Sequence, residues 1–85
     1  MNVTFTAEAW SHHTYWQKAD KKLIAKINAL IKECQRHPFE GTGKPEALRG
    51  DLSGFVSRRI NHAHRLVYRI HGNAIEIVSC RYHYS

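Results

Sequence analysis

The sequence has few cysteines, no long apolar run and few acidic residues, and each scarcity narrows the possible functions. Its two cysteines, Cys34 and Cys80, lie far apart without paired spacing, so neither a disulfide framework nor a cysteine-based zinc site is expected. We expect both to be buried free thiols in a reducing compartment. No apolar stretch is long enough to span a membrane, and residues 1–6 are too short and polar for a signal peptide. These absences predict a cytoplasmic protein with no membrane partner.

Acidic residues are also scarce, with 7 Asp and Glu against 13 Lys and Arg, so the net charge is +6 even with neutral histidines. Such a balance points to a polyanion, either nucleic acid or an acidic protein partner. A basic surface that only keeps the protein soluble is as common, so charge alone does not decide between binding a polyanion and simple solubility. The 85 residues fit one domain, residues 1–85, and leave no room for a deep cofactor cleft. No cofactor is expected.

The N-terminal half predicts a short strand followed by two helices. Asn2–Phe5 alternates polar and apolar residues, Thr6 is a candidate N-cap for a helix from residue 7 to about 18, and Asp20 can cap the next helix. Pro38 ends that second helix. Apolar residues recur along it at helical spacing: Leu23, Ile24, Ile27, Leu30, Ile31 and Cys34.

The C-terminal half predicts a loop and then strands. Residues 39–50 hold glycine and proline without a sustained period, which indicates a loop that carries functional groups. Three strands are expected after it, at residues 54–60, from 62 or 63 to 70, and from 75 to about 84. His71-Gly72-Asn73 favours a tight hairpin turn between the last two.

Alternation along the middle strand separates two faces. Leu66, Tyr68 and Ile70 share one, and Arg65, Val67 and Arg69 share the other. Along the last strand, alternation does not assign the apolar residues to one consistent face, which suggests a twist or a bulge. The expected fold class is α+β, with two N-terminal helices packed on one face of a small, mostly antiparallel β-sheet and a basic face left open.

Several polar side chains have the chemistry that metal-independent RNA cleavage needs. The 2′-hydroxyl of RNA can attack the adjacent phosphate if a base removes its proton, an acid protonates the leaving oxygen and cations stabilise the phosphorane. Glu46 is the candidate base and His83 the candidate acid, with Arg65 and Arg59 as the phosphate clamp. Arg81 adds a further cation at the chain end. Each has a plainer explanation, namely a solvated carboxylate, a surface ion pair or a packed chain end.

Histidines and aromatics give weaker signals. His12-His13 and the His62-x-His64 pair invite a metal site, but no zinc-spaced cysteine pair accompanies them, so solvated histidines are the better explanation. Three helical aromatics, Trp10, Tyr15 and Trp16, offer stacking surfaces for bases, yet core packing is the expected role in so small a protein.

A series of short motifs resembles the YoeB (Txe) toxins of the RelE/ParE superfamily. The motifs are Tyr15-Trp16-Gln17, Lys26-Ile27-Asn28, Leu30-Ile31-Lys32, Pro38-Phe39-Glu40-Gly41, Gly43-Lys44-Pro45-Glu46, Leu52-Ser53-Gly54-Phe55, Ser57-Arg58-Arg59-Ile60, His64-Arg65-Leu66-Val67-Tyr68 and Cys80-Arg81-Tyr82-His83-Tyr84. The resemblance covers nearly the whole chain. Two positions depart from it: Ser85 follows the usual final tyrosine, and Val56 stands where a tryptophan is familiar.

The resemblance implies a microbial RNase fold and the toxin half of a type II toxin–antitoxin pair, which enters the ribosomal A site and cuts mRNA there. The catalytic positions of the family match Glu46, Arg65, His83 and Tyr84, and its basic RNA- or ribosome-binding positions match Lys44 and Arg59. Expected partners are a YefM-type antitoxin, the 70S ribosome with its mRNA, a second copy in a homodimer, and operator DNA through the antitoxin complex only.

Two other functions stay open at this point. One is a non-catalytic toxin that binds a protein, as ParE-like relatives bind gyrase, although such relatives generally lack this acid–base set. The other is a plain RNA-binding domain, whose lysines and arginines bind RNA without cleaving it. How acid and base roles divide among Glu46, His83 and Tyr84 depends on side-chain distances.

Overall fold

The N-terminal half begins with one strand and two helices, as predicted. The computed structural model describes residues 1–82. Strand β1 (Asn2–Phe5) precedes helices α1 (Ala7–Ala19) and α2 (Lys21–Arg36). Both predicted caps are confirmed, because the Thr6 hydroxyl accepts the Ala9 amide at 3.1 Å and the Asp20 carboxylate accepts the Leu23 amide at 3.0 Å. The described residues include no helix with the length and hydropathy that crossing a bilayer requires.

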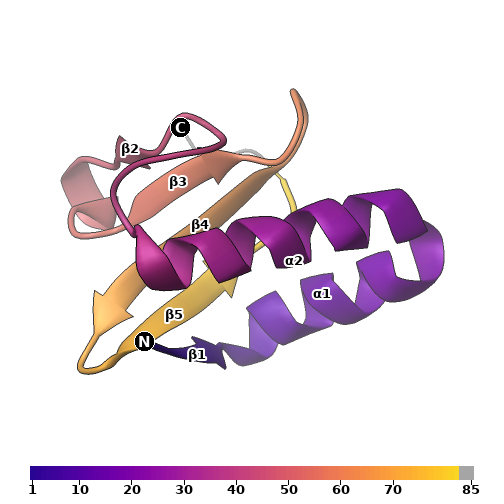
Figure 1. Ribbon diagram of the computed structural model, residues 1–85, viewed down its shortest axis with the longest axis horizontal. Coiled ribbons are helices and arrows are strands. Elements are labelled where there is room, and N and C mark those ends of the chain that lie inside the picture. Colours follow the sequence, from indigo (N-terminus) through magenta and orange to yellow (C-terminus); the bar gives the residue numbers. More distant parts are fainter. Residues whose placement is uncertain (83–85) are drawn as a thin grey trace.

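The remaining elements complete a five-stranded sheet behind the helices (Figure 1). They are β2 (Glu46–Ala47), the short 3₁₀ helix η1 (Gly50–Leu52), β3 (Val56–Arg59), β4 (Arg65–His71) and β5 (Ala74–Ser79). The strand order is β1-β5-β4-β3-β2, with β1 parallel to β5 and the other neighbours antiparallel. The α+β prediction, with both helices on one face of a mostly antiparallel sheet, is confirmed.

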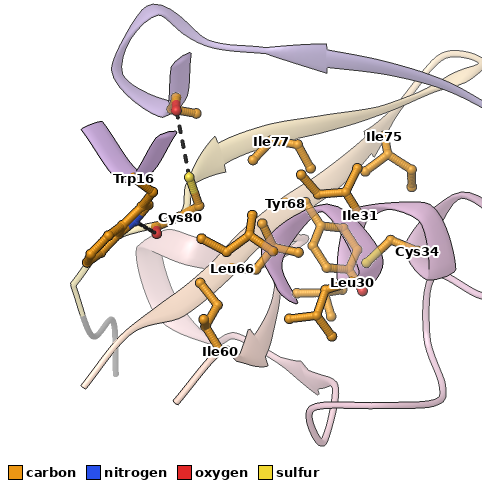
Figure 2. Packing of buried hydrophobic residues seen from close by; sticks show 13 residues of the cluster. Trp16, Leu30, Ile31, Cys34, Ile60, Leu66, Tyr68, Ile75, Ile77 and Cys80 are labelled. Carbon is orange, nitrogen blue, oxygen red and sulfur yellow. Dashed lines mark hydrogen bonds between the residues drawn. The ribbon is translucent and has the colours of Figure 1, made fainter. Parts of the chain in front are cut away.

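The core lies between α1, α2 and the central strands (Figure 2). Both cysteines are buried and free, as predicted, and burial raises the pKa of the Cys80 thiol to about 12. Val56 is also part of this core. The expectation for the helical aromatics holds for Trp16 only: Trp10 is 53% exposed and Tyr15 is 43% exposed.

The loop and several strand limits differ from the prediction. Strands β3 and β4 begin later than expected, at Val56 and Arg65. The loop contains strand β2, which periodicity could not reveal because a two-residue strand is too short to show a period. The final strand ends at Ser79 instead of continuing to about Tyr84. The predicted irregularity is present: Val67 pairs with Ser79 while Tyr68 pairs with Ile77, so Val78 is an extra residue that shifts the register. The bulge allows Cys80 to join Ile77 in the core.

Candidate active site

Glu46 lies on β2, at the edge of the sheet. It is opposite Ser57 of β3 in an antiparallel pair, so the two side chains project from the same face. This is the face turned away from the helices, called the far face below, because Val56 and Arg58 alternate with Ser57 and point into the core side. Glu46 itself is exposed. Its position on a strand fixes the face from which its side chain leaves the backbone.

Arg59 and Arg65 meet on the same far face. They are opposite each other in the β3–β4 ladder, and Arg59 is two residues beyond Ser57. A diagonal neighbour on an adjacent antiparallel strand is about 7–8 Å away, which gives the spacing of Glu46 and Arg59. Register therefore places the predicted base one strand away from Arg59 and two strands away from Arg65, all on the far face.

The centre of the far face is less open than predicted. Ser57 and Val67 are buried there, whereas Arg59 is exposed and Arg65 is partly exposed. Arg69, farther along β4, binds the Glu76 carboxylate at 2.7 Å and lies over the Phe55 ring. Arg69 is thus held by local partners at the end of the face away from Arg59 and Arg65.

Lys44 precedes β2 in a tight turn. Gly43 and Lys44 both have positive φ values, 86° and 52°. A Cβ on Gly43 would lie 2.9 Å from the Arg59 carbonyl oxygen, so this position requires glycine. The Arg59 amide donates to the Gly43 carbonyl at 2.7 Å, which ties the turn to β3. The turn brings Lys44 close to the strand that carries Arg59.

A buried arginine fixes the loop that leads to Glu46. Arg58 is fully buried, and its guanidinium donates to the carbonyls of His37, Glu40 (2.8 Å) and Thr42 (3.1 Å). Its Nε donates to the Tyr68 hydroxyl at 2.9 Å. Burial raises the pKa of Tyr68, which keeps that hydroxyl neutral. Sequence reasoning missed this role, although Arg58 shares strand parity with apolar Val56 and Ile60.

The segment after β5 runs back beside Arg65. The Arg65 amide donates to the Tyr82 carbonyl at 2.9 Å, and the Tyr82 amide donates to His64 Nδ1 at 2.8 Å. The Trp16 indole donates to the Cys80 carbonyl at 2.9 Å, a bond drawn in Figure 2. Residue 82 is therefore fixed next to Arg65 at the start of β4.

The last predicted site residues lie at this end of the chain. The Arg81 guanidinium stacks over the Tyr15 ring, 3.7 Å from its centroid, and also lies near the rings of Trp16 and Tyr82. His83 and Tyr84 lie outside the described residues. Their catalytic roles stay predictions, as do the RNA-binding roles of Lys44, Arg59 and Arg81.

The prediction of solvated histidines is wrong for the helical pair. His12 and His13 are buried on α1, in line with Ala9 and Trp16 at helical spacing, which is the signal that sequence analysis overlooked. His13 hydrogen-bonds Asn28 at 2.7 Å and Gln17 at 2.9 Å. Among residues 1–82, no cluster of three His, Cys, Asp or Glu side chains is arranged to hold a metal ion.

Comparison with known proteins places the chain in a family. The model of the YoeB-like toxin of bacterial type II toxin–antitoxin systems matches residues 5–84. The chain belongs to this family of toxins. Toxin YoeB of Escherichia coli K12 is 51% identical over 84 residues, covering 99% of this chain and all of the relative.

Solved YoeB structures have the same fold. The YoeB dimer from Staphylococcus aureus is 50% identical, with a TM-score of 0.91 over 99% of this chain and 98% of that one. A heterotetrameric YoeB–YefM toxin–antitoxin complex from the same species is 50% identical, with a TM-score of 0.90 and the same coverage. This chain is therefore a type II toxin of the YoeB family.

Proposed function

We propose that this toxin is a ribosome-dependent endoribonuclease that cleaves mRNA in the ribosomal A site and stops translation. The observation that carries the proposal is the ladder register that projects Glu46, Arg59 and Arg65 from one face of neighbouring strands. Tyr82, whose carbonyl accepts the Arg65 amide, holds the chain beside the start of β4 at the residue before His83.

In the proposed reaction, Glu46 accepts the proton of the RNA 2′-hydroxyl as its oxygen forms a bond to the adjacent phosphorus. The bond from phosphorus to the 5′-oxygen breaks, and His83 donates the proton that this leaving oxygen takes up. Arg65 and Arg59 stabilise the phosphorane by charge-assisted hydrogen bonds, with Lys44 and Arg81 binding RNA nearby. Tyr84 completes the proposed catalytic set.

The partners follow from the relatives and from the proposed reaction. A YefM-type antitoxin is the expected inhibitor, since the similar S. aureus toxin forms a complex with YefM. A second copy of the chain is the other expected partner, by analogy with the S. aureus dimer. The substrate is mRNA on the 70S ribosome, so the toxin acts in the cytoplasm, and it meets operator DNA only through the antitoxin complex.

Primer extension on a translating ribosome complex with a defined mRNA tests the proposal. We expect the wild-type protein to cut at the A-site codon. Glu46→Gln and His83→Ala should each reduce the cleavage rate by about 100-fold or more, because each removes a proton-transfer group. Arg65→Gln should reduce it by about 100-fold through lost phosphorane stabilisation.

Two matched controls keep the test specific. Glu40→Gln changes another exposed loop carboxylate, and Arg69→Gln changes an arginine on the same strand and face as Arg65. Both should cleave close to the wild-type rate. Folded wild-type protein that leaves the message intact would contradict the proposal, and inhibition of purified gyrase by that protein would favour a protein-binding toxin.

A further inference from the structure

The backbone of residues 80–82 is held by hydrogen bonds, most of them to side chains. The Cys80 amide donates to His12 Nδ1 at 3.3 Å, and the Cys80 carbonyl accepts the Trp16 indole. The Ser79 hydroxyl pairs with both the amide and the carbonyl of Arg81, at 3.5 and 2.9 Å. Tyr82 donates to His64 and accepts from the Arg65 amide. Every polar backbone atom of these three residues has a partner.

Tyr82 adopts a conformation that needs such support. Its φ is +73°, in the left-handed region that non-glycine residues seldom occupy. Strain of this kind persists only where surrounding contacts impose it, and it is common at functional sites. Tyr82 donates its amide to His64 and accepts the Arg65 amide at its carbonyl, so both of its peptide groups are held. The backbone conformation of Tyr82, the last described residue, therefore depends on these two hydrogen bonds.

His64 is presented by a rigid turn. The Asn61 side-chain oxygen accepts the amides of Ala63 and His64, both at 2.8 Å. The Ile60 amide donates to the His64 carbonyl at 3.0 Å. The imidazole packs edge-on against Trp16, with ring centroids 4.9 Å apart. The acceptor nitrogen thus has little freedom to move away from the Tyr82 amide.

We propose that His64 is a positioning residue: its neutral imidazole accepts the Tyr82 amide and thereby fixes Tyr82, the residue before the predicted acid His83, beside Arg65. The role rests on the proposed function. Because Nδ1 is the acceptor, the proton of the neutral ring is on Nε2. Protonation of Nδ1 would place two hydrogens face to face and break the bond.

The surroundings of His64 favour the neutral ring. Burial lowers the pKa of His64, and the positive charge of Arg81 and the neighbouring His62 lower it further. The rings of Trp16 and Tyr82 also face it. The bond to Tyr82 should therefore be intact at neutral pH and be lost only as the pH falls below the ordinary histidine value of about 6.5.

Amide hydrogen exchange of Tyr82, measured by NMR on the whole chain across this pH range, tests the contact without any need for activity. Wild-type protein should protect this amide at neutral pH and lose protection in acid. His64→Ala should lose it at every pH. His64→Asn should keep it throughout, since the asparagine oxygen takes the place of Nδ1 and does not titrate. The exposed neighbour supplies the control, His62→Asn, which should follow wild type.

Cleavage by the same variants tests the consequence. His64→Ala should lower the rate at saturating substrate by about 10- to 100-fold, since a displacement of about 1 Å at a catalytic group has an effect of this size. Its substrate KM should change little. His64→Asn should restore most of the rate and lose less of it than wild type in acid.

The outcomes separate this inference from the function on which it rests. Equal Tyr82 exchange in wild type and folded His64→Ala would overturn the positioning role, and so would an unchanged cleavage rate in that variant. Wild-type protein that cleaves no RNA would end the nuclease proposal. His64-dependent protection of Tyr82 would still support the contact in that case.

Discussion

Arg58 and Arg59 are adjacent residues of the same type with opposite environments. Arg58 is fully buried and binds three loop carbonyls and the Tyr68 hydroxyl. Arg59 is exposed on the far face opposite Arg65. The alternation of a strand is enough to separate them, because successive side chains point to opposite faces. The comparison shows how one short strand contributes to stability on one face and to a candidate active site on the other.

The two faces of β3 also act together. Arg58 holds the loop from His37 to Thr42, and the same loop continues through Lys44 to Glu46. The Arg59 amide anchors the Gly43 carbonyl between them. The buried arginine therefore supports, from the core side, the position of Glu46 on the far face.

The largest expected effect on the free energy of unfolding comes from replacing Arg58. Arg58→Met should lower the free energy of unfolding by about 3–5 kcal/mol, because it leaves a buried hydroxyl and several carbonyls without their donor. Arg59→Met, the matched control, should change it by less than about 0.5 kcal/mol. Urea unfolding followed by Trp16 fluorescence measures both. Equal stability of the two variants would contradict the conclusion that the core side of β3 stabilises the fold and the far face does not.

A smaller effect is expected at Tyr68. Its hydroxyl accepts from Arg58 Nε and donates to the Pro38 carbonyl at 2.5 Å, so it joins the guanidinium to the start of the loop. Tyr68→Phe should cost about 1–3 kcal/mol in the same unfolding experiment. The control is Tyr15→Phe, an exposed tyrosine on α1, which should be near wild type. If Tyr68→Phe unfolds like the control, the hydroxyl is not part of the anchor.

Much of the fold could be predicted from the sequence because its signals are local. The stripe from Leu23 to Cys34, the caps Thr6 and Asp20 and the turn at Gly72 each depend on nearby residues, and all are confirmed. Strand β2 could not be predicted, since its two residues pair only because the Arg58 network and the Gly43 turn place them against β3.

The candidate site was predicted less completely. Alternation placed Arg65 on the far face, but the meeting of Arg59 with Arg65 and of Glu46 with Ser57 depends on ladder register. The supporting residues were missed for a related reason. His64 reaches Tyr82 across 18 residues of sequence, and Trp16 reaches Cys80 across 64, so no short pattern marks these contacts.

The smallest expected effect is on the pH dependence of the free energy of unfolding, where the buried His12 should differ from the exposed His62. Burial is the main cause that lowers the pKa of His12; Glu8 opposes it by raising that pKa, and Arg81 adds to the lowering. His12 Nδ1 faces the Ser79 hydroxyl and the Cys80 amide, and its ring meets the edge of Tyr82. The unfolded chain therefore binds a proton more readily at this position.

The contribution of neutral His12 to stability should be complete above about pH 6.5. It should fall as the pH drops through the lowered pKa of the folded protein, by about 1.4 kcal/mol for each pKa unit between the two states. Urea unfolding as a function of pH should show a shallower acid loss in His12→Asn than in wild type, and His62→Asn should keep the wild-type slope. A wild-type slope in both variants would mean that the buried histidine does not contribute to the acid sensitivity of the fold.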